Sequence, residues 1–518
     1  MSFDLGRLDP STRPASIELT PLTRFVLIVL MLGMCVYMGA MFDVTMLVMA
    51  LGLFNVGVVV FLLLRKDITW GFLFYLITVI FFQTGFWIRL PGFPDLYPAR
   101  IVSMLLFLVF FIQIMLGTRQ VPKLGPIEKT MIFFMVVMFI SIVTSGQKPR
   151  WLLIMRGYIY PFMFFYFARA VVNRIEQIRI VLWFLAILGI YFAVMGIFEK
   201  MKWYGLVWPR FIVDPTLRDH GLTRLGFRVR GIFLQPAVLG TVMTMGFFPA
   251  WHYMSHLRGI PPVIVRLILI VTTPATIFFT QTRSCYVGFL AALLVVAGWS
   301  RRMRPMAVGV ILAGMVGVFL NWGNLSSEDR EKGGLGQLNT IHYRVSLALE
   351  ALEMFVDHPF FGVGFMNMEE AIIQYRRPRD VPIFGHIDLG TGHAAVSHNI
   401  LITVLAEQGI LGLAPYVLIY FLLIRAAQSA YRSLPARGVM SREYVVCVMA
   451  AFMAYFVNAM ALEMRYFEYV NVLFFFLLGS LLGVSDRLEQ DQAAAVEAAG
   501  EAVATPVVPR LAIRRAGA

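Results

Sequence analysis

Long apolar runs recur along almost the whole chain, and they limit it to one class of fold. About fourteen of these runs have a length of roughly 17 to 25 residues, which an α-helix needs to cross the hydrocarbon core of a membrane. Helices are required there, because a loop or an open sheet edge facing lipid leaves backbone groups without hydrogen-bond partners. With 59% hydrophobic and only 14% charged residues, the composition excludes a water-soluble globular protein. The sequence therefore predicts an all-α polytopic membrane protein.

The predicted spans divide the chain into three parts. They lie near residues 22–41, 43–64, 69–88, 99–117, 127–146, 151–172, 178–199, 232–255, 262–280, 284–300, 305–322, 397–424, 441–462 and 466–485. A long polar segment, 323–396, separates the eleventh span from the twelfth. We expect a polar N-terminal segment at 1–21 without a cleaved signal peptide. A transmembrane domain follows at 22–485, and then a disordered tail at 486–518, which is rich in Ala, Glu and Val.

Basic residues in the short loops set the expected orientation, because positively charged loops are retained on the cytoplasmic side. These loops alternate correctly if both chain ends are cytoplasmic. They carry Arg65 and Lys66, Arg119 and Lys123, Arg174 and Arg179, Arg301, Arg302 and Arg304, and Arg425, Arg432, Arg437 and Arg442. The same alternation places residues 147–150, 199–231, 281–283 and 323–396 on the outer face. All the unusual polar residues therefore fall on that face.

Arginines in the outer segments run against this charge bias. They are Arg210, Arg218, Arg224, Arg228 and Arg230 in one segment and Arg330, Arg344, Arg376, Arg377 and Arg379 in another. Most are explained as solvated loop residues, but a subset suits an anionic ligand, because a guanidinium group matches phosphate oxygens in pairs and keeps its charge. Arg230 precedes Gly231 where the eighth predicted span begins, and an arginine anchored at the interface explains that position equally well. Arg283 interrupts an apolar stretch, where membrane anchoring and ligand contact are equally good interpretations.

The long outer segment contains an amphipathic pattern with helical spacing. Apolar residues from Ala348 to Phe355 follow Arg344 and predict a helix that lies on the membrane surface or caps a cavity. It stops at Asp357-His358-Pro359, which we interpret as fixing a turn, because no second cluster of metal ligands accompanies it. Gly362-Val363-Gly364 is interpreted as a turn as well, since no strand precedes it as in a phosphate-binding loop.

Ser397-His398-Asn399 places a titratable imidazole where the twelfth predicted span begins. A lone histidine followed by asparagine is explained by helix capping at the interface. The outer-face arginines favour a chemical role instead, because a neutral histidine near its usual pKa is suited to accept a proton. Glu407 follows some nine residues later, deep enough in the span that its charge requires a partner.

The order of these motifs resembles that of the O-antigen ligase and O-antigen polymerase superfamily of bacterial membrane glycosyltransferases. The motifs are Arg230-Gly231-Ile232-Phe233-Leu234-Gln235-Pro236, Thr280-Gln281-Thr282-Arg283-Ser284, Arg344 with Asp357-His358-Pro359 and Gly362-Val363-Gly364, and Ser397-His398-Asn399 with Glu407, Gly409 and Gly412. The likeness is strongest over residues 225–425, and the first seven spans match only in general character.

The resemblance implies transfer of a glycan from undecaprenyl diphosphate to a hydroxyl group of an acceptor glycan or lipid, at the periplasmic face of the bacterial inner membrane. It also implies that His398, Arg344 and Arg230 are essential and that no metal or cofactor takes part. In chemical terms, His398 would act as the general base while Arg344 and Arg230 stabilise the departing diphosphate. Attack from the face opposite the diphosphate predicts inversion at the anomeric carbon. Further substrate contacts are expected from Arg283, Arg228, Asn399, Arg376 and Arg377.

Several functions compete with one another. We favour a polymerase of a cell-surface polysaccharide, because the chain has more predicted spans than a compact ligase needs; an O-antigen ligase acting on lipid A-core or on protein is the alternative. A flippase for the lipid-linked glycan would predict repeated halves and broken helices, and a non-catalytic scaffold would leave His398 unexplained. The expected partners are the lipid-linked oligosaccharide, its acceptor, the membrane and a chain-length regulator, but no nucleic acid.

Overall fold

The computed structural model describes residues 67–82, 98–119, 121–146, 150–214, 228–327, 339–382, 384–387 and 397–504. All of them belong to the second of two units into which the chain divides, Asp67–Ala518. The predicted N-terminal segment and the spans at 22–41 and 43–64 lie outside the described residues, as do residues 505–518 of the predicted tail.

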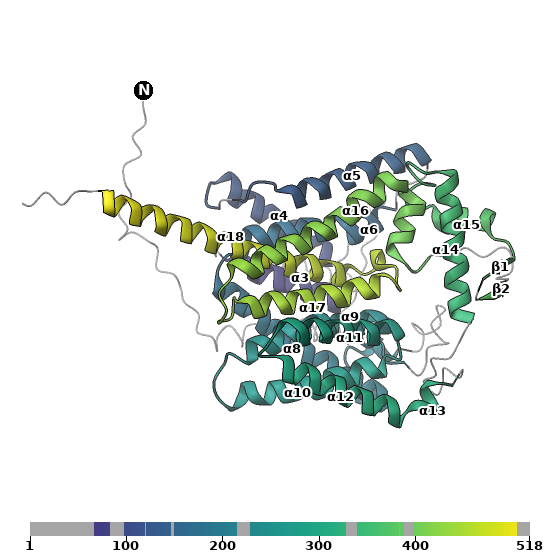
Figure 1. The fold of residues 1–518 in the computed structure, drawn as a ribbon, viewed down its shortest axis with the longest axis horizontal. Coiled ribbons are helices and arrows are strands. Elements are labelled where there is room, and N and C mark those ends of the chain that lie inside the picture. The colour runs from purple at the N-terminus through teal and green to yellow at the C-terminus, as the bar shows by residue number, and fades with distance from the viewer. Residues whose placement is uncertain are drawn as a thin grey trace, which may run out of the picture. The chain divides into compact units, whose positions relative to one another are not determined.

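Helices make up most of the described structure (Figure 1). In chain order the elements are α3 (Thr69–Phe81), α4 (Pro98–Met115), α5 (Pro126–Ser145), α6 (Trp151–Ile154), η2 (Met155–Ile159), α7 (Tyr160–Val171), α8 (Ile175–Lys200), η3 (Tyr204–Leu206), η4 (Arg210–Val213), η6 (Gly231–Phe233), α9 (Pro236–Met254), α10 (Ile260–Phe279), α11 (Arg283–Trp299), α12 (Arg304–Leu320), α13 (Trp322–Leu325), α14 (Asn339–Asp357), α15 (Met368–Tyr375), β1 (Arg379–Val381), β2 (Gly385–Ile387), α16 (Ile400–Ser433), α17 (Arg442–Ala459), η8 (Met464–Tyr466) and α18 (Glu468–Ala504).

Eight stretches of the described residues are long and apolar enough to cross a membrane. They are Pro98–Met115, Pro126–Ser145, Trp151–Val171, Ile175–Lys200, Ile260–Phe279, Ile400–Ser433, Arg442–Ala459 and Glu468–Ala493. Helices α3, α11 and α12 are apolar but shorter. These apolar helices confirm the predicted all-α membrane class. The only strands among the described residues form one short two-stranded hairpin. The predicted number of about fourteen spans is not confirmed.

One boundary differs from the prediction. Helix α18 continues to Ala504, so residues 486–504 of the predicted disordered tail are helical. The physical reason is local: this stretch is rich in alanine, glutamate and glutamine, which are strong helix formers even where few contacts support them.

The bundle packs most closely where α18 runs along α7. Glycines on α18 permit this approach, because a Cβ atom at Gly483 would lie 2.6 Å from the carbonyl oxygen of Arg169. Aromatic rings fill the space beside the two helices. Phe72 of α3 stacks on Phe476 of α18 with 3.5 Å between the ring centroids. The buried face of α18 thus holds elements from both halves of the described chain together.

The amphipathic helix predicted after Arg344 is present as α14. Figure 1 shows it crossing the ends of the long helices at the right-hand side, with α15 and the β1–β2 hairpin beyond it. Its buried side packs against α15 and the start of α16 through Leu347, Ala351 and Met354, which contact Met368 and Ala406. The helix therefore covers one end of the bundle, the end at which α16 begins.

Helix α16 is broken at Gly409, whose φ and ψ of 61° and −160° are not helical. The loop that follows α14 supplies the missing hydrogen bonds. The amide of Val363 donates to the carbonyl of Ala406 (2.9 Å), and that of Gly364 donates to Glu407 (3.0 Å). In return the amide of Ile410 donates to the carbonyl of Pro359 (2.9 Å). A break in a membrane helix is tolerated only where protein satisfies the freed backbone groups, and the turn at residues 359–364 does so here.

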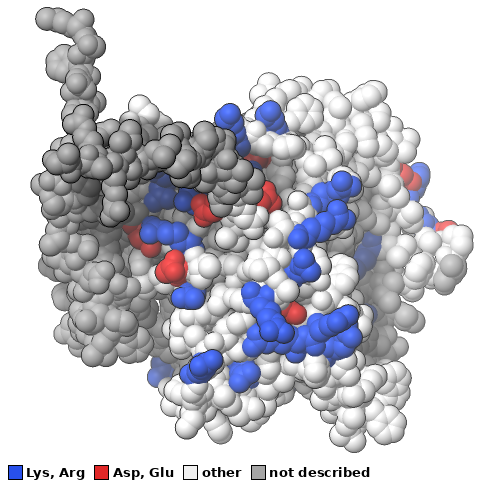
Figure 2. All heavy atoms as spheres, turned by 60° about the vertical axis from the view of Figure 1, so that its left-hand side comes forward, with Lys and Arg blue, Asp and Glu red and all other residues white. Residues whose placement is uncertain are grey.

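The other end of the bundle is basic. Figure 2 shows Lys and Arg side chains gathered on one face of the molecule with few acidic residues between them. Exposed arginines lie at the end of α16, where Arg425 and Arg432 line a small polar groove with Gln428 and Ser429. Further exposed arginines lie in the neighbouring loops: Arg258, Arg301, Arg302, Arg304, Arg437 and Arg442. These arginines, most of which were expected in cytoplasmic loops, thus lie far from the start of α16.

Candidate functional site

His398 and Arg344 interact electrostatically at the end of the bundle where α16 begins. Arg344 stands near the start of α14 and donates from Nη2 to the carbonyl of Ala461 (3.2 Å), just beyond α17. His398 is half-buried and has a φ of 54°, a left-handed conformation that is uncommon for a residue with a side chain. Two of the three residues predicted to carry the chemistry therefore interact electrostatically, although they come from distant parts of the chain.

The surroundings of His398 favour its neutral form. Burial lowers the pKa of His398 below its ordinary value, the positive charge of Arg344 lowers it further, and the carboxylate of Glu463 opposes both. At neutral pH the imidazole is consequently unprotonated and can accept a proton.

Asn399 caps α16. Its Oδ1 accepts hydrogen bonds from the amides of Leu401 (3.0 Å) and Ile402 (3.3 Å), which have no partner inside the helix. Ser397 is buried beside it and bonds through its hydroxyl to Thr403. The capping interpretation of Asn399 is thus confirmed, and its predicted contact with a substrate stays a prediction.

A buried ion cluster lies directly beneath this turn and consists of Glu407, Arg465 and Glu463. Arg465 of η8 is 2% exposed. It donates from Nε to Glu463 (2.8 Å) and from Nη2 to Glu407 (3.2 Å). The second oxygen of Glu463 accepts from the hydroxyl of Thr403 (2.7 Å). The partner that the charge of Glu407 was expected to require is therefore Arg465.

Arg230 is buried and is not exposed at the surface of the protein. It is 4% exposed, and its Nε lies 3.9 Å from Oε1 of Glu199, the penultimate residue of α8. The amides of Arg230 and Gly231 donate to the same carboxylate, at 3.1 Å and 2.8 Å. This contact fixes the turn that leads into α9. The predicted catalytic role of Arg230 stays a prediction.

Arg228 and Arg283 lie near the start of α11. Arg228 interacts electrostatically with Cys285, and Arg283 is the first residue of that helix. The thiol of Cys285 bonds to Oδ1 of Asn458 at the end of α17 (3.6 Å). Ala461, which accepts from Arg344, follows three residues later. Both arginines consequently occupy the same end of the bundle as His398.

Two other predicted ligands of the substrate have partners on α14. Nε of the buried Arg376 lies 3.7 Å from Oε1 of Glu350. Exposed Arg377 pairs with Glu353 (2.7 Å), which also binds Arg379 (2.8 Å). These pairs hold the chain leading into β1 against α14. A substrate contact by Arg376 or Arg377 stays a prediction.

The sequence reasoning missed Glu463 and Arg465. Both stand in the short segment between the last two predicted spans, to which the sequence analysis assigned no role. One signal was available: two charged residues of opposite sign next to apolar runs require partners, as Glu407 did. The partner could not be identified without the fold, because nothing in the spacing connects residue 407 with residue 465.

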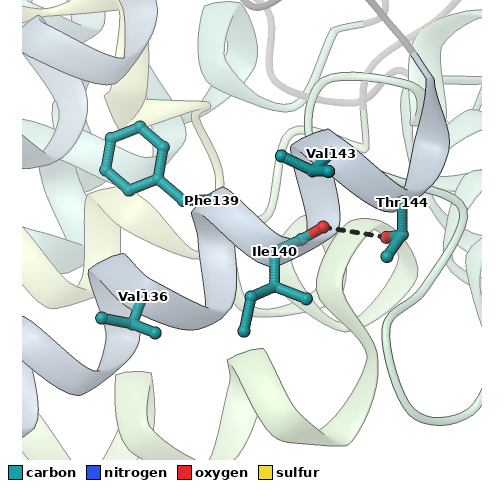
Figure 3. Close-up of a pocket in the computed structure, with 5 residues that line it drawn as sticks. All are labelled: Val136, Phe139, Ile140, Val143 and Thr144. Atoms are coloured by element: carbon teal, nitrogen blue, oxygen red, sulfur yellow. Dashed lines mark hydrogen bonds between the residues drawn. The ribbon is translucent and has the colours of Figure 1, made fainter.

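An apolar hollow elsewhere on the surface does not belong to this site. It lies along α5 and is lined by Val136, Phe139, Ile140, Val143 and Thr144 (Figure 3). The only hydroxyl among these side chains, that of Thr144, bonds to the carbonyl of Ile140 (2.9 Å). Exposed apolar side chains on a membrane helix are suited to contact lipid, and none of these five can act as an acid or base.

Residues 267–417 match the family model described as O-antigen ligase. This region is similar to the O-antigen ligase family, and the match supports the resemblance to that superfamily. The match runs from α10 past the break in α16 and includes Arg283, Arg344 and His398, whereas Arg230 and Glu463 lie outside it. Together with the apolar helices, it supports a multi-pass membrane enzyme of the O-antigen ligase or polymerase type. No curated protein matches the chain.

Proposed function

We propose that the protein is a glycosyltransferase that transfers a glycan from undecaprenyl diphosphate to a sugar hydroxyl at the periplasmic face of the inner membrane. The observation that carries this proposal is the electrostatic interaction of His398 and Arg344 inside the O-antigen ligase region. Their segments are also linked, because Arg344 bonds to Ala461 and the turn after His398 bonds to Glu463 through Thr403. A base and a cation at the membrane boundary suit a reaction in which a hydroxyl loses a proton while a diphosphate leaves.

The proposed step forms one bond to the anomeric carbon and breaks another. The acceptor oxygen attacks that carbon while its proton passes to the neutral imidazole of His398. The bond to the diphosphate oxygen breaks, and the diphosphate keeps the electron pair. Arg344 stabilises the negative charge that accumulates there, a contribution worth about 3 kcal/mol for one well-placed donor. Because the acceptor enters opposite the leaving group, the configuration inverts.

The charge distribution supports the proposed orientation. Exposed arginines gather at the end of α16 that is remote from His398, and basic loops are retained in the cytoplasm. With that end inside, the candidate site faces the periplasm and both chain ends are cytoplasmic.

Within this function we favour a polymerase, which adds repeat units to a growing glycan, because the sequence contains more apolar runs than a compact ligase needs. A ligase is the second candidate, since the matching family model is described as O-antigen ligase. The product separates them: a polymerase gives a ladder of lipid-linked chains, whereas a ligase moves one chain to a different acceptor.

The decisive experiment uses purified protein in liposomes with lipid-linked oligosaccharide extracted from the native membrane. We expect His398→Ala to lower transfer by about 10²- to 10⁴-fold and Arg344→Ala to lower it by a similar factor. His386→Ala and Arg437→Ala remove an exposed histidine and an exposed arginine away from the site, and both should leave transfer unchanged. Full activity in both site variants would refute the assignment, and lipid movement across the bilayer without transfer would indicate a flippase.

A further inference from the structure

The turn that presents His398 is tied to a carboxylate behind it. Ser397 bonds to Thr403 one turn into α16, and the Thr403 hydroxyl donates to Oε2 of Glu463 (2.7 Å). Glu463 is 2% exposed, and its other oxygen accepts from Nε of Arg465 (2.8 Å). With both oxygens held, the Glu463 side chain cannot turn away from the histidine.

The buried ion cluster contains more carboxyl groups than guanidinium groups. Two carboxylates, Glu407 and Glu463, share the single guanidinium group of Arg465. When both are ionised, one negative charge is not balanced within the cluster. A buried charge acts over a longer range than an exposed one, because little water screens it. With both carboxylates ionised, the cluster can therefore stabilise a group that gains positive charge nearby.

His398 is such a group, and charges of opposite sign act on it. Arg344 acts on the imidazole from α14, and Glu463 acts on it from the segment before η8. Arg465 bonds to Glu463 and also to Glu407. Arg344 suits the diphosphate side of the reaction, since cations there stabilise the leaving group. The carboxylate of Glu463 is suited to stabilise His398 after the imidazole has taken up a proton.

We propose that Glu463 is a positioning residue that stabilises the imidazolium form of His398 while the acceptor hydroxyl is deprotonated. This inference rests on the proposed function. The proton leaves the hydroxyl for the imidazole as the new glycosidic bond forms, and it later passes to water or to the departed diphosphate. Glu463 stays bonded to Thr403 and Arg465 throughout. Its effect is to lower the free energy of the imidazolium form of His398, which the positive charge of Arg344 disfavours.

Substitution Glu463→Gln tests this without emptying the cluster. Glutamine retains polar atoms for Thr403 and Arg465, and Arg465 keeps Glu407 as its counter-ion. The matched control is Glu128→Gln, because Glu128 is also buried and also shares one arginine, Arg169, with a second carboxylate, Asp486. That cluster joins the start of α5 to α18 at a distance from His398.

The first readout needs no substrate. Protein labelled with [¹³Cε1]histidine is titrated by NMR in nanodiscs, and the His398 signal is assigned by its loss in His398→Gln. We expect Glu463→Gln to move the titration midpoint of His398 to lower pH by about one pH unit, whereas Glu128→Gln leaves it in place. Glu463→Asp, which keeps the charge, should return the midpoint toward the wild-type position. A midpoint that does not move in Glu463→Gln would overturn the inference.

The second readout is glycan transfer from the extracted lipid-linked oligosaccharide. We expect Glu463→Gln to lower kcat by at least about tenfold with little change in KM, and Glu463→Asp to recover part of the loss. A wild-type rate in Glu463→Gln would overturn the positioning role even if the titration moves. Wild-type protein that transfers no glycan would refute the proposed function itself, and the titration is read independently of that result.

Discussion

Gly362 lies against the backbone of Glu407, so close that a Cβ atom on Gly362 would overlap the Glu407 carbonyl carbon and lie 2.5 Å from the amide nitrogen of Gln408. Its φ of 65° is also one that residues with side chains rarely adopt. The turn after α14 can close the break in α16 only because this position has no side chain.

Replacement Gly362→Ala should therefore destabilise the protein by about 3 kcal/mol or more, from backbone strain and steric overlap together. Thermal unfolding of the purified protein in detergent measures the effect. Gly146→Ala is the matched control, since Gly146 has a φ of 66° but no atom within 4 Å of an added Cβ. Equal losses in the two variants would show that strain alone, and not contact with α16, makes glycine necessary.

Replacement Arg465→Gln leaves two buried carboxylates without their cation. Removing one partner of a buried ion pair typically costs about 3 to 5 kcal/mol, and we expect a loss of that size in thermal unfolding. The double variant Glu407→Gln with Arg465→Gln should recover part of it. Arg487→Gln breaks an exposed pair with Asp491 and should change stability by less than about 1 kcal/mol. No recovery in the double variant would contradict the charge explanation.

The pH dependence of transfer follows from the lowered pKa of His398. A general base works only when unprotonated, so activity should fall as the pH drops through a pKa below the ordinary value of 6.5. Arg344→Gln removes a cation that lowers this pKa, and the acidic limb of the profile should move to higher pH. Arg344→Lys keeps the charge and should leave the limb in place. The profile of kcat/KM against pH measures both, and identical limbs in Gln and Lys variants would argue against coupling between Arg344 and His398.

Cysteine labelling in intact cells tests the orientation. The chain has three cysteines. Cys285 and Cys447 are buried and should not react, and the substitution Cys35→Ser removes the remaining one. In that background an impermeant maleimide should label His386→Cys, on the hairpin beyond α14, but not Ser429→Cys in the basic groove. Permeabilised cells should label both. The reverse pattern would place the site in the cytoplasm.

Much of the helical layout could be predicted from the sequence, because apolar length alone forces membrane helices. The start of α16 near residue 397 and the helix after Arg344 are examples. The break at Gly409 could not be predicted, since the hydropathy of the surrounding run is continuous and the hydrogen bonds that permit the break come from Pro359 and Val363. The same holds for Arg465: its role depends on contacts with Glu407 and Glu463 that bring distant helices together.

The order of synthesis gives the broken helix α16 a particular advantage. Residues 359–364 are made before α16, so the segment that closes the break already exists when the helix enters the membrane. A helix with open backbone groups would be unstable in lipid by itself. Its insertion and the docking of the preceding turn are therefore coupled, and a chain whose outer segment fails to fold would also fail to hold α16 in the bilayer.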